Sequence, residues 1–123
     1  MSTNQDYEQA MQARMGEFRA LAERLAPVRE PRYLAWLRYQ PCCVCGRLPS
    51  IGHHPRLPGA AGMGQKPDDR TAVPLCFGHH TGREGVHQVG ERAFWPRHGA
   101  DPVAVAKRLW ARYAREKSGR AAR

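Results

Sequence analysis

The segment CFGHHTGREGVH, residues 76–87, contains three of the six histidines of the chain and one of its four cysteines. Its first four residues place a cysteine and a histidine with two residues between them, and the segment CCVC, residues 42–45, contains a cysteine pair with the same gap. Two such pairs, brought together by a hairpin, supply the four ligands of a tetrahedral structural zinc. The alternative is that the cysteines are small buried hydrophobic residues. The matched spacing favours zinc, and the predicted ligands are Cys42, Cys45, Cys76 and His79.

Cys43 is the cysteine that this assignment leaves over. If Cys43 replaced Cys42 as a ligand, only one residue would separate it from Cys45, which is a tighter and rarer arrangement. We therefore expect Cys43 to pack inward.

Assigning His79 to zinc leaves four other histidines to explain: His53, His54, His80 and His87. Neighbours in an extended segment point to opposite faces, so His53 and His54 should have different roles. Three neutral imidazoles around a divalent ion leave open coordination positions, which a hydrolytic site needs. A single histidine is more often an ordinary surface or core residue, and we accept that interpretation for His98. The four together favour a second metal site, because the zinc ligands would bring the two adjacent pairs close in space.

Length and charge limit the class of protein. A chain of 123 residues is typical of a single domain with a small core, which a metal often supplements. Twenty Lys and Arg residues against eleven Asp and Glu give a net charge of +9, which favours a polyanionic partner such as nucleic acid over the alternative of a merely solvated basic surface. No apolar run is long enough to span a bilayer, and the N-terminus lacks a signal-peptide pattern. We therefore expect a soluble, cytoplasmic protein, in which cysteines bind metal rather than form disulfides.

The first half of the sequence predicts two helices followed by two strands. Apolar residues at helical spacing indicate an amphipathic helix from about residue 5 to residue 26, formed by Tyr7, Met11, Phe18, Leu21 and Leu25. A second helix should begin near Pro31 and bury Leu34 and Leu37, with Tyr33 or Trp36 flanking them. Short strands are expected near residues 50–54 and 71–75, the second with Pro74 in an edge position, and residues 57–69 read as a loop.

The second half predicts helices. A short helix should begin around Cys76 or His79, and another should cover residues 90–97 and stop near Pro96. The last helix begins after Asp101, which is a suitable N-cap. We expect the final residues to form a frayed basic tail.

Four segments together resemble a known family: PCCVCG, GHH, GMGQKPDDRTAVPLCFGHH and GVHQVGERAFWPRHG, in that order. They are similar to the phage recombination-enhancement (RecA-dependent) nucleases, a branch of the HNH endonucleases with a ββα-metal core. The resemblance covers roughly residues 33–113, and residues 1–30 lie outside it.

The resemblance implies a role for each histidine. The first of the pair on the first strand, His53, is a metal ligand, and the second, His54, is the general base. His80 and His87 complete the ligands of the catalytic ion.

Two positions depart from the family pattern. The asparagine of the HNH name would fall near Thr71, so another residue must orient the base, and Asp68 and Asp69 are candidates. In addition, His80 and His87 are seven positions apart, where many HNH proteins have four.

The sequence thus predicts an α+β protein: a small zinc-stapled ββα-metal (HNH) core over residues 31–117, an N-terminal amphipathic helix within 1–30 and a basic tail at 118–123. The expected function is metal-dependent DNA cleavage in phage recombination, with structural Zn²⁺ and a catalytic Mg²⁺, Mn²⁺ or Zn²⁺. The implied partners are DNA and a RecA-type recombinase filament. The alternative is a non-catalytic zinc module that binds DNA or protein. Six arginines are candidates for phosphate contacts: Arg56, Arg70, Arg83, Arg97, Arg112 and Arg115.

Overall fold

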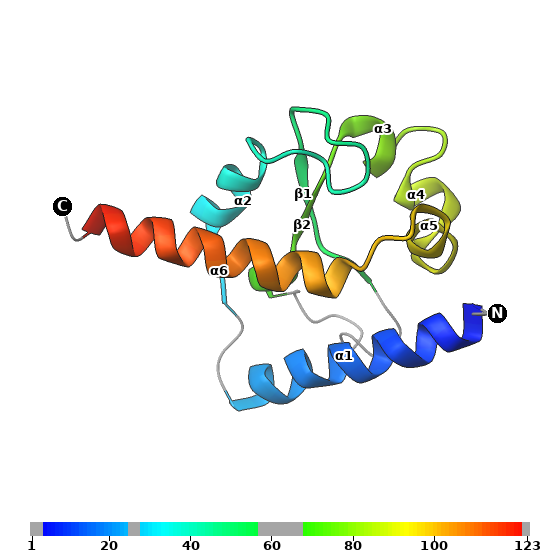
Figure 1. Ribbon diagram of the computed structural model, residues 1–123, viewed down its shortest axis with the longest axis horizontal. Helices are drawn as coiled ribbons and strands as arrows, with labels where there is room; N and C mark the ends of the chain where they lie inside the picture. Colours follow the sequence, from blue (N-terminus) through cyan, green and yellow to red (C-terminus); the bar gives the residue numbers. More distant parts are fainter. Residues whose placement is uncertain (1–3, 25–27, 57–67, 122–123) are drawn as a thin grey trace.

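Two short antiparallel strands lie between the helices in the computed structural model, which describes residues 4–24, 28–56 and 68–121 (Figure 1). Strand β1 (Ile51–His53) pairs with β2 (Val73–Leu75), and Gly52 stands opposite Pro74. Pro74 has no N–H to give to β1. Its carbonyl instead accepts a hydrogen bond of 2.9 Å from the backbone N–H of Cys43 on the other side of β2. Both strands and the edge position of Pro74 are as predicted, and the protein is mixed α+β.

Helices make up most of the rest of the described chain. In chain order they are α1 (Asn4–Arg24), α2 (Pro31–Leu37), the 3₁₀ turn η1 (Asp69–Thr71), α3 (Phe77–His80), α4 (Val86–Val89), α5 (Glu91–His98) and α6 (Pro102–Ala121). Within the described residues no helix is long and apolar enough to cross a membrane. Most of the predicted loop at 57–69 lies outside the described residues.

The core contains buried residues of α2, β2, α5 and α6. Its largest fully buried side chains are Trp95, Tyr33, Phe94, Leu37 and Leu75. The ring of Tyr33 packs edge-on against Trp110 and Tyr113 of α6, and its hydroxyl donates a hydrogen bond of 3.2 Å to the carbonyl of Ala72. The sequence predicted Leu34 and Leu37 as the buried face of α2, and this prediction was wrong in part. Tyr33 is buried with Leu37, and Leu34 is only half-buried, because α6 lies over the Tyr33 side of the helix.

Helix α1 packs on α5 and α6. Met11 and Met15 are buried and Tyr7 is half-buried, in agreement with an amphipathic helix. The side chains of Phe18 and Leu21 lie outside the described part, as does all of Leu25.

Helices α5 and α6 both extend beyond the predicted ends. Pro96 lies inside α5, which continues to His98 and ends at Gly99, a residue with a left-handed φ of 59°. Pro96 lacks the N–H that would bond to the carbonyl of Arg92, but the loss of this one bond does not stop α5. Asp101 caps α6 as predicted, since its Oδ1 accepts hydrogen bonds from the N–H groups of Val103 and Ala104. The predicted frayed tail is wrong up to Ala121, because α6 includes those residues.

Candidate functional site

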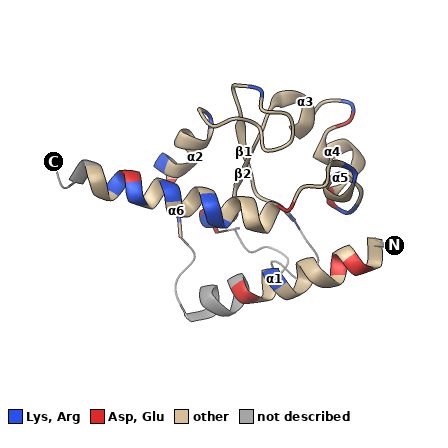
Figure 2. Ribbon diagram, viewed as in Figure 1, with Lys and Arg blue, Asp and Glu red and all other residues tan. Residues whose placement is uncertain are grey.

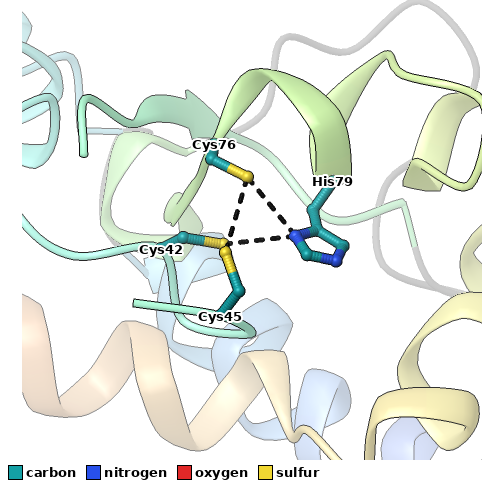
Figure 3. A group of neighbouring side chains, drawn as sticks. All are labelled: Cys42, Cys45, Cys76 and His79. Carbon is teal, nitrogen blue, oxygen red and sulfur yellow. Dashed lines mark hydrogen bonds between the residues drawn. The ribbon is translucent and has the colours of Figure 1, made fainter. Parts of the chain in front are cut away.

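Three cysteines and one histidine converge beside the end of β2 (Figure 3). Cys76 follows β2 directly and His79 lies one turn further, in α3. Cys42 and Cys45 come from a tight turn, closed by a 2.8 Å hydrogen bond from Gly46 N–H to the carbonyl of Cys42. Gly46 has a φ of 79°, which glycine adopts without strain. The hydrogen bond from the N–H of Cys43 to the carbonyl of Pro74 attaches this turn to β2. The sheet therefore brings the pair of Cys42 and Cys45 close to the pair of Cys76 and His79.

The separations within this Cys₃His group fit a metal ion. The Sγ–Sγ distance from Cys45 to Cys76 is 3.7 Å, and Nδ1 of His79 lies 3.3 Å from Sγ of Cys76 and 3.9 Å from Sγ of Cys42. Ligand atoms around a tetrahedral zinc lie about 3.3 to 3.8 Å apart. All four cysteines are free thiols. The group can therefore hold a metal ion, as the sequence predicted.

Local electrostatics favour the ligand forms of two of these side chains. Burial would raise the pKa of Cys42, but backbone N–H groups of Cys76, Cys45 and Val44 that bond to its sulfur lower the pKa overall. Burial also lowers the pKa of His79, assisted by the nearby His98 and Arg47. A thiolate and a neutral imidazole are the forms that bind metals.

Cys43 differs from its neighbours. It packs against the core, and burial, with Cys42 adjacent, raises the pKa of its thiol to about 12. Its inward packing is as predicted.

The second group consists of His53, His80 and His87. They come from the end of β1, the end of α3 and α4, and one nitrogen of each lies within 4.8 Å of the others. The Nε2 atoms of His80 and His87 are 3.0 Å apart, and the ring of His53 is centred 5.2 Å from His80 and 5.1 Å from His87. His53 is buried, His80 is half-buried and His87 is exposed. The cluster therefore opens to solvent on the side of His87.

His80 is suited to ligation. Burial lowers its pKa, and the neighbouring His53 and His87 lower it further, so the neutral ring is favoured. Its Nδ1 is buried without a hydrogen-bond partner among the described residues. One ring nitrogen from each of His53, His80 and His87 could bind a single divalent cation.

His54 is not part of this cluster and has a different partner from His53, as expected for its neighbour in an extended segment. Its Nε2 is 2.9 Å from Oδ1 of Asp69, which is 5% exposed. The other oxygen of Asp69 accepts a 2.7 Å hydrogen bond from the N–H of Glu30. Of the two predicted candidates, Asp69 is therefore the residue that contacts His54.

Asp68 has a different role. Its carboxylate accepts hydrogen bonds from the side chain of Arg70 at 2.9 and 2.7 Å and from the N–H of Val28. Burial would raise the pKa of Asp68, but these bonds outweigh burial and lower it. Asp68 thus joins η1 to the segment before α2.

Glu91 is a site residue that the sequence analysis missed. Its Oε2 lies 2.8 Å from Nε2 of His53, and its Oε1 accepts a 2.6 Å hydrogen bond from Nε1 of Trp95. The available signals were its position four residues after His87 and four residues before Trp95, which are helical spacings.

The six candidate arginines are not equivalent. The guanidinium of Arg70 is held by Asp68, and its side chain is only 14% exposed. Arg97 pairs with Glu84 at 2.9 Å on the surface, and Arg112 lies over the ring of Trp36 at 5.7 Å. The remaining three are exposed: Arg56, Arg83 and Arg115. Basic residues recur along α6 (Figure 2).

A family described as "Protein of unknown function (DUF968)" matches residues 23–114, about three quarters of the chain. The chain belongs to this family. The DUF968 match includes both metal-ligand groups and the pair of His54 and Asp69, and it leaves out nearly all of α1.

One relative of this DUF968 chain is the "Uncharacterized protein YdfU" of Escherichia coli (strain K12), which is 40% identical over 63 residues. The aligned part is 51% of this chain and 18% of that protein, so the chain spans less than a fifth of its relative. No solved structure matches the chain significantly.

Proposed function

We propose that the chain is a metal-dependent DNA endonuclease with a ββα-metal core of the HNH type. The observation that carries this proposal is the convergence of His53, His80 and His87 next to the hydrogen-bonded pair of His54 and Asp69. A protein with only a structural zinc would need the Cys₃His group but not these five residues.

The order of elements supports the core assignment. Two antiparallel strands, β1 and β2, are followed directly by α3, and the candidate ligands His53 and His80 stand at the ends of β1 and α3. We assign structural zinc to the Cys₃His group, because its donor set and separations suit that ion.

His54 would act as the general base. In a neutral ring whose Nε2 donates to Asp69, Nδ1 keeps its lone pair and can take a proton from the attacking water. Asp69 would hold the ring in that tautomer and stabilise the charge that the ring gains.

The three-histidine cluster would hold a divalent cation beside this base. Such an ion supplies positive charge to the oxygens of a phosphodiester as negative charge develops on them. Mg²⁺, Mn²⁺ and Zn²⁺ are the candidates. The exposed arginines and the net charge of +9 would attract the DNA backbone. The family resemblance extends the proposal to phage recombination in the cytoplasm, with a recombinase filament as partner.

Replacing His54 tests the proposal. We expect the purified protein, with each divalent ion in turn, to cleave single-stranded or duplex DNA, and His54→Ala to lower the rate about 100-fold to 10,000-fold, because that is the usual value of general-base catalysis. Cleavage by His54→Ala at the wild-type rate would contradict the assignment. Metal analysis separates the alternative, since two ions per chain support the nuclease and one supports a zinc module.

A further inference from the structure

Glu91 connects the histidine cluster to the core. It is the first residue of α5, and each of its carboxylate oxygens contacts one ring nitrogen, from Trp95 and His53 respectively. Trp95 is fully buried and His53 is 4% exposed, so both contacts are shielded from water. Glu91 is not one of the side chains whose ligand atoms lie within 4.8 Å of one another. It would therefore act on a bound cation through His53.

The indole of Trp95 determines how this hydrogen-bond chain runs. An indole N–H can only donate, which fixes Oε1 of Glu91 as an acceptor. Both oxygens of an ionised carboxylate are acceptors, so with Glu91 ionised Nε2 of His53 carries the proton that it donates. In the neutral ring this leaves the lone pair of His53 on Nδ1.

We propose that Glu91 is a positioning residue that fixes the orientation and tautomer of His53, leaving Nδ1 as the nitrogen that binds the cation. This inference rests on the proposed function, because the cation is the one held with His80 and His87. Metal-binding histidines usually donate their other ring N–H to a carboxylate or carbonyl, and loss of that partner typically weakens metal affinity 10-fold to 100-fold.

The first test is titration with Co²⁺, followed by visible absorption, on protein whose Cys₃His group has been loaded with Zn²⁺. We expect Glu91→Gln to bind Co²⁺ about 10-fold to 100-fold more weakly than wild type, with unchanged zinc content and thermal midpoint. The amide oxygen would stay on Trp95, so the amide NH₂ would face Nε2 of His53 and favour the wrong tautomer. Glu84→Gln is the matched control, since it removes one exposed acidic group that contacts no histidine.

A double variant makes the test specific to hydrogen-bond direction. The double variant Glu91→Gln with Trp95→Phe has no indole N–H to hold the amide. The amide can then turn its oxygen toward Nε2 of His53. We therefore expect much of the Co²⁺ affinity to return. A folded double variant that binds no better than Glu91→Gln would overturn the inference, as would wild-type affinity in Glu91→Gln.

The tautomer of His53 can also be measured directly in wild type. This test does not require the double variant to fold. ¹⁵N NMR of the imidazole nitrogens in zinc-loaded wild type should show His53 protonated at Nε2. Protonation at Nδ1 would overturn the assignment. If zinc-loaded wild type binds no Co²⁺, the proposed nuclease site fails, and the NMR result still decides whether Glu91 fixes the tautomer.

Discussion

Asp69 is the residue whose charge the proposed base depends on. Asp69→Asn keeps the side-chain size and can still accept the N–H of Glu30, but its NH₂ would face Nε2 of His54 and favour the tautomer with the proton on Nδ1. We expect the cleavage rate constant to fall about 100-fold to 10,000-fold, with little change in KM, because the base is lost.

Asp68→Asn is the matched control for this substitution. Asp68 is the adjacent carboxylate, and its contacts are with Arg70 and Val28. Its variant should cleave at close to the wild-type rate. Equal losses in the two variants would show that the effect comes from the fold of η1 and not from His54.

Asp68 should instead affect how the free energy of unfolding depends on pH. Its pKa in the folded protein is below the ordinary 3.8, so its contribution to the free energy of unfolding is fully present above that value and is lost as pH falls through the folded pKa. The stability difference between wild type and Asp68→Asn should be constant from about pH 7 to pH 5 and shrink below about pH 4. Urea unfolding at several pH values measures it, and because both proteins share the metal groups, effects of acid on those groups cancel. A gap that widens in acid would contradict this assignment.

At the scale of elements, the connection between α3 and α4 sets the distance between two candidate ligands. A Cβ atom on Gly85 would lie 2.8 Å from the backbone carbon and oxygen of His80, so only glycine allows this approach. We expect Gly85→Ala to push α4 away and to weaken Co²⁺ binding to the histidine cluster. Overpacking should also lower the free energy of unfolding by about 1 to 3 kcal/mol.

Gly78→Ala provides the comparison for Gly85→Ala. A Cβ atom on Gly78 would meet nothing within 4 Å, although the residue lies in the neighbouring helix α3. This variant should bind Co²⁺ like wild type and unfold with a free energy equal to or up to about 1 kcal/mol above that of wild type. If both variants lose Co²⁺ affinity equally, steric separation of α3 and α4 is not the cause.

The elements that the sequence predicted well are those with local signals. The Cys₃His group follows from two short spacings, and the cap of α6 from Asp101 and the residue after it. The strands follow from β-prone residues between turn residues.

The predictions that failed depended on contacts between distant residues. Helix α6 continues past residue 118 because its last turns are held from elsewhere: Glu116 accepts a hydrogen bond from Trp36, and Lys117 donates one to Glu30. These partners are 80 or more positions away, and a sequence pattern does not show them. Glu91 was missed for the same reason, since His53 is 38 positions away. The ion pair of Arg70 with Asp68 is the opposite case, because the two residues are only two positions apart and the sequence shows them together.

For the whole molecule, the Cys₃His group should be needed for folding. Structural zinc typically contributes an apparent binding free energy of about 10 to 16 kcal/mol, comparable with or larger than the roughly 5 to 15 kcal/mol by which whole domains are stable. Removal of zinc by a chelator should therefore abolish the cooperative thermal transition, measured by circular dichroism together with zinc content. The group joins the turn after α2 to α3, and the small sheet alone would not hold them.

His87→Ala distinguishes the two candidate metal groups when Co²⁺ binding, zinc content and the thermal midpoint are all measured. His87 is exposed and belongs to the histidine cluster, so this variant should lose Co²⁺ binding and keep both its zinc and its thermal midpoint. A fall in zinc content on this substitution would mean that the two groups are not independent.

Exposure rises across the histidine cluster from His53 to His87, which sets the side from which an ion could reach it. His53 is buried beside the ring of Trp95 and His87 is exposed, so among the described residues the open side of the cluster is the side of His87. In the proposed nuclease, approach from this side would bring one strand at a time to His54. Each chain would then make nicks, and a break through both strands would require a second turnover or a second molecule acting on the opposite strand.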